Sequence, residues 1–338
     1  MSFFRDLLQN RKATFGLLIL GAFALIALVG PWLVRDPAEF LGDPLAPPST
    51  EFWLGTTRQG QDVFAQTIAG ARTSLVLGFV VGLVVTFIGA TIGIAAGFLG
   101  GWVDDLLSLL TNVFLIMPGL PLAVVLAAYL EAGPASMAFV LILTGWAWNA
   151  RVIRAQTLSL AQKDFVKAAL VGGESRLRIM FFELFPNMTS IIVSGFIGAT
   201  VYAIGAQVGL EFLGLGDVSQ VTWGTNLYWA SNNQDLLTES WWTIAPTGIC
   251  VALVGFALVL VNFAIDEITN PRLRSAGAFN RILAQAGATA GFSTPVLRTQ
   301  PGSVSSAKAD TQVPPVLRTQ PGSVSSAKAG SRGPEGEA

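Results

Sequence analysis

Six long stretches without charged residues constrain the fold of this chain more than any other feature. When Asp, Glu, Lys and Arg are counted as breaks, each stretch approaches or exceeds the ~20 residues that a helix needs to cross a bilayer. The stretches are Ala13–Val34, Thr73–Val103, Leu106–Leu130, Ala132–Ala150, Leu184–Leu210 and Ser240–Ile265. The alternating pattern of a membrane β-barrel is absent. We therefore predict an all-α membrane protein with six transmembrane helices, at about residues 13–34, 74–100, 106–130, 135–150, 189–210 and 243–264.

The composition agrees with this class and argues against several others. Charged residues make up 12% of the chain and apolar residues 52%, whereas a soluble domain carries roughly 25% charged residues. The chain has no histidine, and its one cysteine is Cys250, so an internal disulfide or a cysteine-based zinc site is excluded. With 20 Lys+Arg against 21 Asp+Glu, there is no basic footprint for nucleic acid. We predict no metal site and no catalytic residue.

The basic residues predict the orientation. If residues 1–12 are cytoplasmic, eleven of the fourteen Lys and Arg residues up to Ser275 lie inside, and only Arg35, Arg58 and Arg72 lie outside. The positive-inside rule then places both termini in the cytoplasm, around a membrane domain of residues 13–274. Residues 275–338 differ in composition, and the 15-residue segment at 295–309 recurs at 315–329. We expect this tail to be a disordered cytoplasmic extension.

Small residues and prolines mark special positions within the spans. The second span carries Gly-x3-Gly pairs along one face, a pattern typical of close helix contacts; its glycines are Gly78, Gly82, Gly89, Gly93 and Gly97. Packing within the subunit is the favoured interpretation, and an interface with a partner subunit is the alternative. Pro118 and Pro121 are expected to break the third span, either opening a cavity or kinking the helix.

The loop of residues 151–186 carries the most informative motif. Its amphipathic pattern is compatible with a segment that lies flat on the membrane. The loop also contains KDFVKAALVGGESRLRIMFFELFPN, in which Ala168, Ala169, Gly173 and Pro186 have the spacing of the EAA loop. In these residues the chain resembles the permease subunits of ABC importers. Small side chains there let a short coupling helix fit closely into a cleft of another protein.

Four further segments, in order along the chain, are similar to the dipeptide/oligopeptide and nickel branch of that superfamily, and in particular to the second permease of the dipeptide/oligopeptide pair. They are RKATFGLLIL at 11–20, GTTRQGQDVFAQTIAGARTSL at 55–75, GLEFLGLGDVSQVTWG at 209–224 and AIDEITNPRLR at 264–274. The chain departs from the family pattern at four positions, where Lys167 replaces Glu, Thr57 replaces Asp, Gln61 replaces Arg and Glu211 replaces Ser. Lys167 reverses a charge at the start of the coupling motif.

The resemblance implies a type I ABC-importer permease in a bacterial plasma (inner) membrane. A second homologous permease would complete the pathway, two ATPase subunits would dock on the EAA loops, and an extracytoplasmic solute-binding protein would deliver a di- or oligopeptide. Lys167, Ala168, Ala169, Gly173 and Pro186 would couple the chain to the ATPases. ATP and Mg would be bound by those partners, since this chain has no G-x4-G-K-[ST] motif. Transport would proceed by alternating access.

Polar residues within the spans are the candidates for the pathway, because each costs free energy in lipid. Asn112, Asn149 and Gln207 are the uncharged candidates, although for each residue a hydrogen bond between helices is the favoured role and a substrate contact is the alternative. Glu211 is the best acidic candidate, although a side chain that snorkels to the membrane interface is the favoured role for it.

The stretch Val218–Gln234 is predicted to be a loop. Interfacial anchors are expected at Trp223, Trp229, Trp241 and Trp242. Nickel chelates or haem are alternative cargoes. A gradient-driven carrier is a less favoured class, because the spans lack central charged residues. A membrane enzyme is disfavoured as well, because a nucleophile–base pair is not evident.

Overall fold

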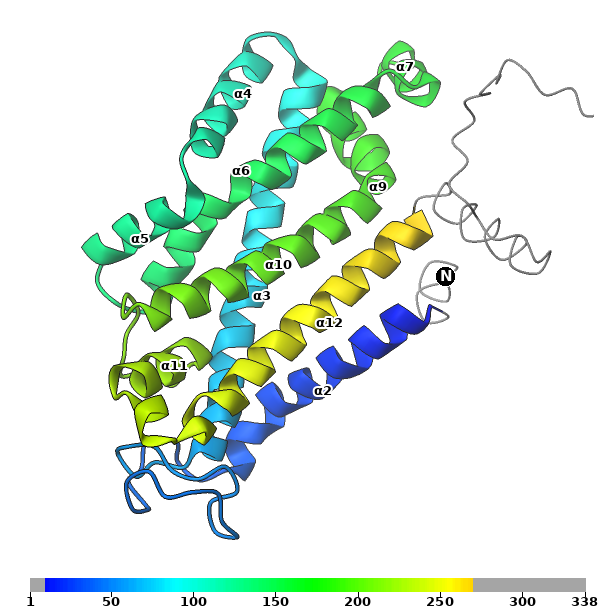
Figure 1. The fold of residues 1–338 in the computed structure, drawn as a ribbon. Coiled ribbons are helices and arrows are strands. Elements are labelled where there is room, and N and C mark those ends of the chain that lie inside the picture. The colour runs from blue at the N-terminus through cyan, green and yellow to red at the C-terminus, as the bar shows by residue number, and fades with distance from the viewer. Residues whose placement is uncertain (1–9, 270–338) are drawn as a thin grey trace, which may run out of the picture. The chain divides into compact units, whose positions relative to one another are not determined.

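The computed structural model describes residues 10–269, and the N-terminal residues 1–9 and the duplicated tail lie outside the described part. Within it the fold is all-helical (Figure 1). The long helices are α2 (Arg11–Leu33), α3 (Val63–Leu99), α4 (Gly101–Ile116), α5 (Gly119–Tyr129), α6 (Pro134–Ala161), α10 (Thr189–Phe212) and α12 (Ala245–Thr269). The shorter elements are α7 (Asp164–Val171), α8 (Arg176–Arg178), the π-helix η1 (Ile179–Leu184), α9 (Phe185–Asn187), α11 (Trp223–Asn232) and the 3₁₀-helices η2 (Asp235–Thr238) and η3 (Trp241–Thr243).

Each of the six apolar stretches lies on a helix or a helix pair. Five helices of the described chain are long and apolar enough to cross a membrane, and α4 with α5 forms a sixth candidate that bends by 85°. The bend falls at Met117, whose extended backbone precedes Pro118. A proline lacks the backbone N–H that a continuous helix needs and disfavours helical geometry in the residue before it. The predicted break of the third span is thus confirmed at Pro118, whereas Pro121 lies in the first turn of α5 and does not break it.

Helix α3 is the central element, and its glycines allow two neighbours to approach closely. A methyl group added at Gly82 would lie 2.3 Å from Thr200 Oγ1 of α10, and one at Gly93 would lie 2.6 Å from the Ala150 carbonyl oxygen of α6. Gly78, Gly89 and Gly97 are similarly enclosed. The glycine face of the second span therefore packs within the subunit, as favoured from the sequence.

The start of α2 and the end of α12 lie together. The Asn10 side chain donates a hydrogen bond of 3.3 Å to Glu267 Oε2, and Lys12 Nζ lies 3.4 Å from the same oxygen. Figure 1 shows these ends on the side of the molecule that carries α7, while residues 34–62 and α11 lie at the opposite end. The ends of the described membrane domain are therefore on one side, the same side as the predicted coupling loop.

Two predictions for the opposite end were wrong. The stretch 218–234 contains helix α11, because Thr222 and Thr225 form a reciprocal cap at its start. Trp223 is not an interfacial anchor: its side chain is 0% exposed, and its indole N–H donates to the Thr67 carbonyl oxygen at 3.0 Å. A buried tryptophan with a satisfied N–H holds α11 firmly against α3.

Candidate translocation cavity and coupling surface

A cavity of about 420 Å³ lies between α5, α6, α10 and α12. Its lining combines polar and apolar side chains with glycines, namely Gly119, Thr144, Gly145, Trp148, Asn149, Val152, Ile153, Ile191, Ser194, Gly195, Gly198, Ala199, Tyr202 and Asn262. None of these residues is Asp, Glu, Lys or Arg. The lining itself therefore offers uncharged hydrogen-bonding groups, and the carboxylate of Asp266 lies next to it, where it accepts a hydrogen bond of 3.2 Å from Ser194.

The polar side chains of the cavity are hydrogen-bonded in small separate groups. The hydroxyls of Thr144 and Tyr202 are 3.1 Å apart. Ser194 donates to Asn262 Oδ1 at 2.6 Å, and the Asn149 amide donates to the Gly195 carbonyl oxygen at 3.4 Å. These bonds leave further acceptor and donor capacity on the amide and hydroxyl groups.

Glycines and a tryptophan shape the space. At Gly145 an added methyl group would lie 3.1 Å from the Tyr202 ring, and at Gly195 it would lie 3.2 Å from Asn149 Oδ1, so larger residues would crowd the polar groups. At Gly198 no atom lies within 4 Å of the added methyl group, so the cavity is open there. Trp148 lines the cavity with 65% of its surface exposed. An exposed tryptophan beside polar groups indicates that the protein does not close the cavity on this side.

The four predicted pathway residues fall in three places. Asn149 lines the cavity, whereas Asn112 lines a separate pocket between α3, α4 and α6. Gln207 and Glu211 lie together in the interior, where the Gln207 amide donates to Glu211 Oε1 at 3.0 Å. The structure thus brings only the last two residues together, and neither lines the cavity.

Glu211 holds the start of α11. Its Oε2 accepts a hydrogen bond of 2.5 Å from the hydroxyl of Thr222, the N-cap residue. The side chain is 5% exposed, so the expectation that it snorkels to the membrane interface was wrong. A carboxylate at a helix N-terminus is stabilised by the helix dipole and by the unpaired N–H groups there. Gly224 leaves room for it, since an added methyl group would overlap the carboxylate.

The residues of the predicted coupling loop lie on short helices after α6. Val166, Ile179 and Leu184 are fully buried and anchor this segment in a core cluster with Ile94 and Ile153. Lys167, Ala168, Gly173 and Pro186 are exposed, and Ala169 is half-buried. The structure therefore gathers the predicted coupling residues on one short segment, with α7 carrying three of them.

The end of α7 has a specific backbone requirement and an apolar surface. Gly173 follows the helix with φ +79°, a left-handed conformation that glycine adopts without strain. Leu170, Val171 and Leu177 are exposed, Val171 by 90%. Uncovered apolar side chains at the end of a membrane protein that carries its charged loops indicate a surface for another protein.

Comparison with known proteins identifies the family. Residues 89–275 match the family model described as binding-protein-dependent transport system inner membrane component. The chain belongs to this family. Residues 2–48 also match the N-terminal transmembrane domain of oligopeptide transport permease C. The matched regions include the whole of the cavity lining and the whole of α7 to α9, which confirms the resemblance drawn from the motifs.

Curated relatives of this inner membrane component align along most of its length. The dipeptide transport system permease protein DppC of Bacillus subtilis (strain 168) is 30% identical over 275 residues, covering 80% of this chain and 85% of the relative. The oligopeptide transport system permease protein OppC of Mycobacterium tuberculosis (strain ATCC 25618 / H37Rv) is 33% identical over 272 residues, covering 78% and 90%. The chain is thus similar to whole permease subunits.

Most of the cavity lining of this family member was not predicted from sequence. Thr144, Trp148, Ser194, Tyr202 and Asn262 share one signal, a polar or amphipathic side chain within an uncharged stretch of sequence. That signal does not say which face of the helix carries the residue. In the described residues no group of three His, Cys, Asp or Glu side chains is arranged to hold a metal ion.

Proposed function

We propose that this permease forms half of a translocation pathway for di- or oligopeptides, and that the cavity between α5, α6, α10 and α12 is its part of that pathway. The observation that carries the proposal is an uncharged polar cavity that is open at Gly198 and Trp148. Hydrogen-bonding groups at the depth of the bilayer are unfavourable against lipid. A second, homologous permease would cover them and complete the pathway.

The lining fits a peptide better than a strongly charged cargo. Amide and hydroxyl groups such as those of Asn149, Asn262 and Tyr202 pair with the N–H and C=O groups that every peptide carries. A pathway without a fixed charge does not select for side-chain charge. The curated relatives are permeases of dipeptide and oligopeptide transport systems, which supports the same cargo here.

The coupling surface, formed by Ala168, Leu170, Val171 and Gly173, would receive an ATPase subunit. The exposed Ala168 and Gly173, together with Leu170 and Val171, offer a small-residue and apolar contact on a segment anchored to α3 and α6. ATP and Mg would be bound on that partner. The positive charge of Lys167 then favours an acidic or neutral rim on the docking cleft.

The opposite end would receive the solute-binding protein, across the loops 35–72 and 211–239. The two loops form one connected surface, because Arg58 lies 3.6 Å from Asp235 and the Trp242 indole N–H donates to the Thr56 carbonyl oxygen at 3.2 Å. Leu237 projects from this surface with 80% of its side chain exposed.

An uptake assay with matched variants tests the pathway. Gly198→Leu adds a side chain to the cavity lining at a point where no atom lies within 4 Å of its Cβ, and Gly21→Leu makes the same change on α2, where no atom lies within 4 Å of the Cβ either. We expect peptide uptake by the reconstituted transporter to fall at least tenfold for the first variant and to stay near normal for the second. Equal uptake by both variants would reject the cavity as the pathway.

Mass spectrometry of the complex after mild detergent extraction tests the partners. We expect a second permease and ATPase subunits to be recovered with the chain. If the chain is recovered alone, with no nucleotide-binding partner, a gradient-driven carrier replaces the importer.

A further inference from the structure

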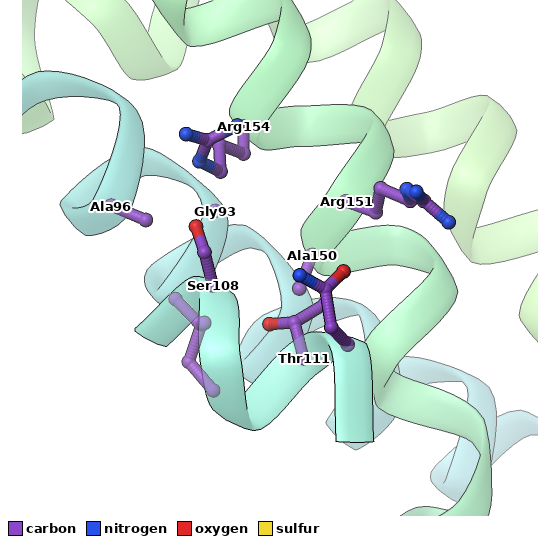
Figure 2. A pocket seen from close by; sticks show the side chains of 9 residues that line it. Gly93, Ala96, Ser108, Thr111, Ala150, Arg151 and Arg154 are labelled. Atoms are coloured by element: carbon purple, nitrogen blue, oxygen red, sulfur yellow. The ribbon is translucent and has the colours of Figure 1, made fainter. Parts of the chain in front are cut away.

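A second pocket, of about 230 Å³, lies between α3, α4 and α6 (Figure 2). Its lining is Ile92, Gly93, Ala96, Ser108, Thr111, Asn112, Ala150, Arg151 and Arg154. Figure 2 shows Ser108 and Thr111 of α4 on the side of that helix that faces Ala150 and Arg154 of α6. The translocation cavity does not include this pocket, although Ala150 and Arg151 directly follow Asn149 in the chain.

The two arginines of the pocket differ in their charge balance. Arg154 forms a two-bond ion pair with Asp104, with Nε and Nη2 at 2.6 and 2.7 Å from the two carboxylate oxygens. Its charge is therefore compensated. Arg151 is exposed, and no carboxylate of residues 10–269 lies within ion-pair distance of it. The uncompensated positive charge of the pocket rests on Arg151.

The free hydrogen-bond donors point to an anion. The hydroxyl of Ser108 donates to Asp104 and that of Thr111 donates to the Leu107 carbonyl oxygen, so neither has a hydrogen to offer. The donors left in the pocket are the Arg151 guanidinium, the Asn112 amide and the remaining N–H groups of Arg154. Figure 2 shows the Arg151 and Arg154 side chains pointing away from each other, so Arg151 and Asn112 are the donors for an oxygen-rich anion such as a phosphate group.

The outer face of α4 indicates that this anion is part of a lipid. Exposed apolar side chains recur at helical spacing along one stripe, at Trp102, Leu106, Leu109, Val113 and Ile116. Ser108 and Asn112 lie beside this stripe, so the pocket opens at the border between polar and apolar surface. A lipid with its headgroup in the pocket would place its acyl chains along this stripe, whereas a free phosphate ion would make no use of it.

We propose that the pocket binds the headgroup of an anionic phospholipid from the cytoplasmic leaflet, with Arg151 as the charged contact and Asn112 as a hydrogen-bond donor. Helix α4, which lines the pocket, lies toward the end of the molecule that carries α7 (Figure 1), and the positive-inside rule assigns that end to the cytoplasm. Basic pockets between membrane helices on that side suit anionic headgroups. The lipid site does not depend on which cargo the pathway carries.

Native mass spectrometry of the full-length chain, purified with its accompanying subunits, tests the site. The probes are phosphatidylglycerol and phosphatidylcholine with identical acyl chains, added to the detergent micelles at increasing concentration. We expect the wild type to prefer the anionic lipid and Arg151→Gln to lower that preference about fivefold, as expected for one arginine near an anionic lipid. Arg151→Lys should retain most of it.

Arg11→Gln is the matched control, because Arg11 is an exposed basic residue on the same side and lies outside the pocket. The proposal fails if Arg151→Gln keeps the lipid preference, or if the control loses it equally. It also fails if millimolar inorganic phosphate displaces the lipid, since the occupant would then be a soluble anion. Absence of the adduct from the intact complex would mean that another subunit covers the pocket, and it would overturn the proposal as well.

Discussion

The contact of α3 with α6 gives the sharpest test of the fold, at Gly93. A methyl group at this position would lie 2.6 Å from the Ala150 carbonyl oxygen, 2.9 Å from Ile153 Cβ and 3.0 Å from the backbone nitrogen of Arg154. Two of these neighbours are backbone atoms of a long helix, which cannot rotate away as a side chain does. Gly93→Ala therefore forces the two helices apart.

The expected magnitude follows from two opposing effects. Overpacking of a closely packed contact costs typically 1–3 kcal/mol, and the rigid backbone neighbours place Gly93 in the upper half of that range. The higher helix propensity of alanine returns up to about 1 kcal/mol. We therefore expect a loss of about 1–2 kcal/mol in the free energy of unfolding, which corresponds to a drop of roughly 2–8 °C in the melting temperature.

Thermal unfolding of the purified chain in detergent measures this loss. Gly205→Ala on α10 is the control, because no atom lies within 4 Å of the added methyl group there. The control should melt at or slightly above the wild-type temperature. If Gly93→Ala is as stable as the control, α3 and α6 are not in contact at this point, and the arrangement of the central helices described here is wrong.

Three further predictions concern the two ends of the molecule. Gly173→Val should uncouple ATP hydrolysis from uptake, because valine rarely adopts the φ of +79° found at this position. Gly173→Asn should keep most of the coupling, because asparagine tolerates that conformation. Equal coupling in both variants would show that the backbone conformation of Gly173 is not required for coupling. Asp104→Asn should lower the unfolding free energy by about 1–3 kcal/mol. Adding Arg154→Gln to this variant should lower the unfolding free energy little further, because the ion pair is already broken. Fully additive losses in this double-mutant cycle would show that the two residues are not coupled. Burial raises the pKa of Asp235 above its ordinary value, so the folded state holds this proton more tightly than the unfolded state. The stability due to this group is thus present below the ordinary pKa and is lost as the pH rises through the raised value. Across that pH window the melting temperature of Asp235→Asn should therefore depend less on pH than that of the wild type, and the melting temperature of Arg58→Gln should depend more on it. The same pH dependence in all three proteins would contradict the assignment.

The apolar stretches predict the helices well because a membrane span leaves few other options for the backbone. The break at Pro118 was predictable for the same reason, since proline acts through its own covalent structure. The residues at which the helices begin and end were less predictable. Asp62 starts α3 well before Thr73 by accepting hydrogen bonds from the N–H groups of Phe64 and Ala65, and the charged residues beyond Ala150 do not end α6, which runs to Ala161.

The candidate site was less predictable because it depends on which face of a helix a polar residue occupies. Asn149 and Gln207 are both amides within uncharged stretches of the sequence, yet one lines the cavity and the other is 0% exposed beside Glu211. Trp223 looked like an anchor because tryptophans favour membrane interfaces. Only the fold of the loop that carries it, with Glu211 at the start of α11, places it in the interior.

The long helix α3 connects the coupling surface with the opposite end of the molecule. Ile94, near one of its ends, packs in the cluster that anchors the coupling segment. Near the other end, Ser74 accepts a hydrogen bond of 3.1 Å from the Trp223 backbone N–H, and Thr67 binds the indole of the same residue. Pulling α11 away from α3 would break these buried bonds and expose Trp223. A displacement of the coupling segment should therefore move α3 and α11 as one body. The change in access should occur on the open side of the cavity, at Trp148 of α6 and Gly198 of α10.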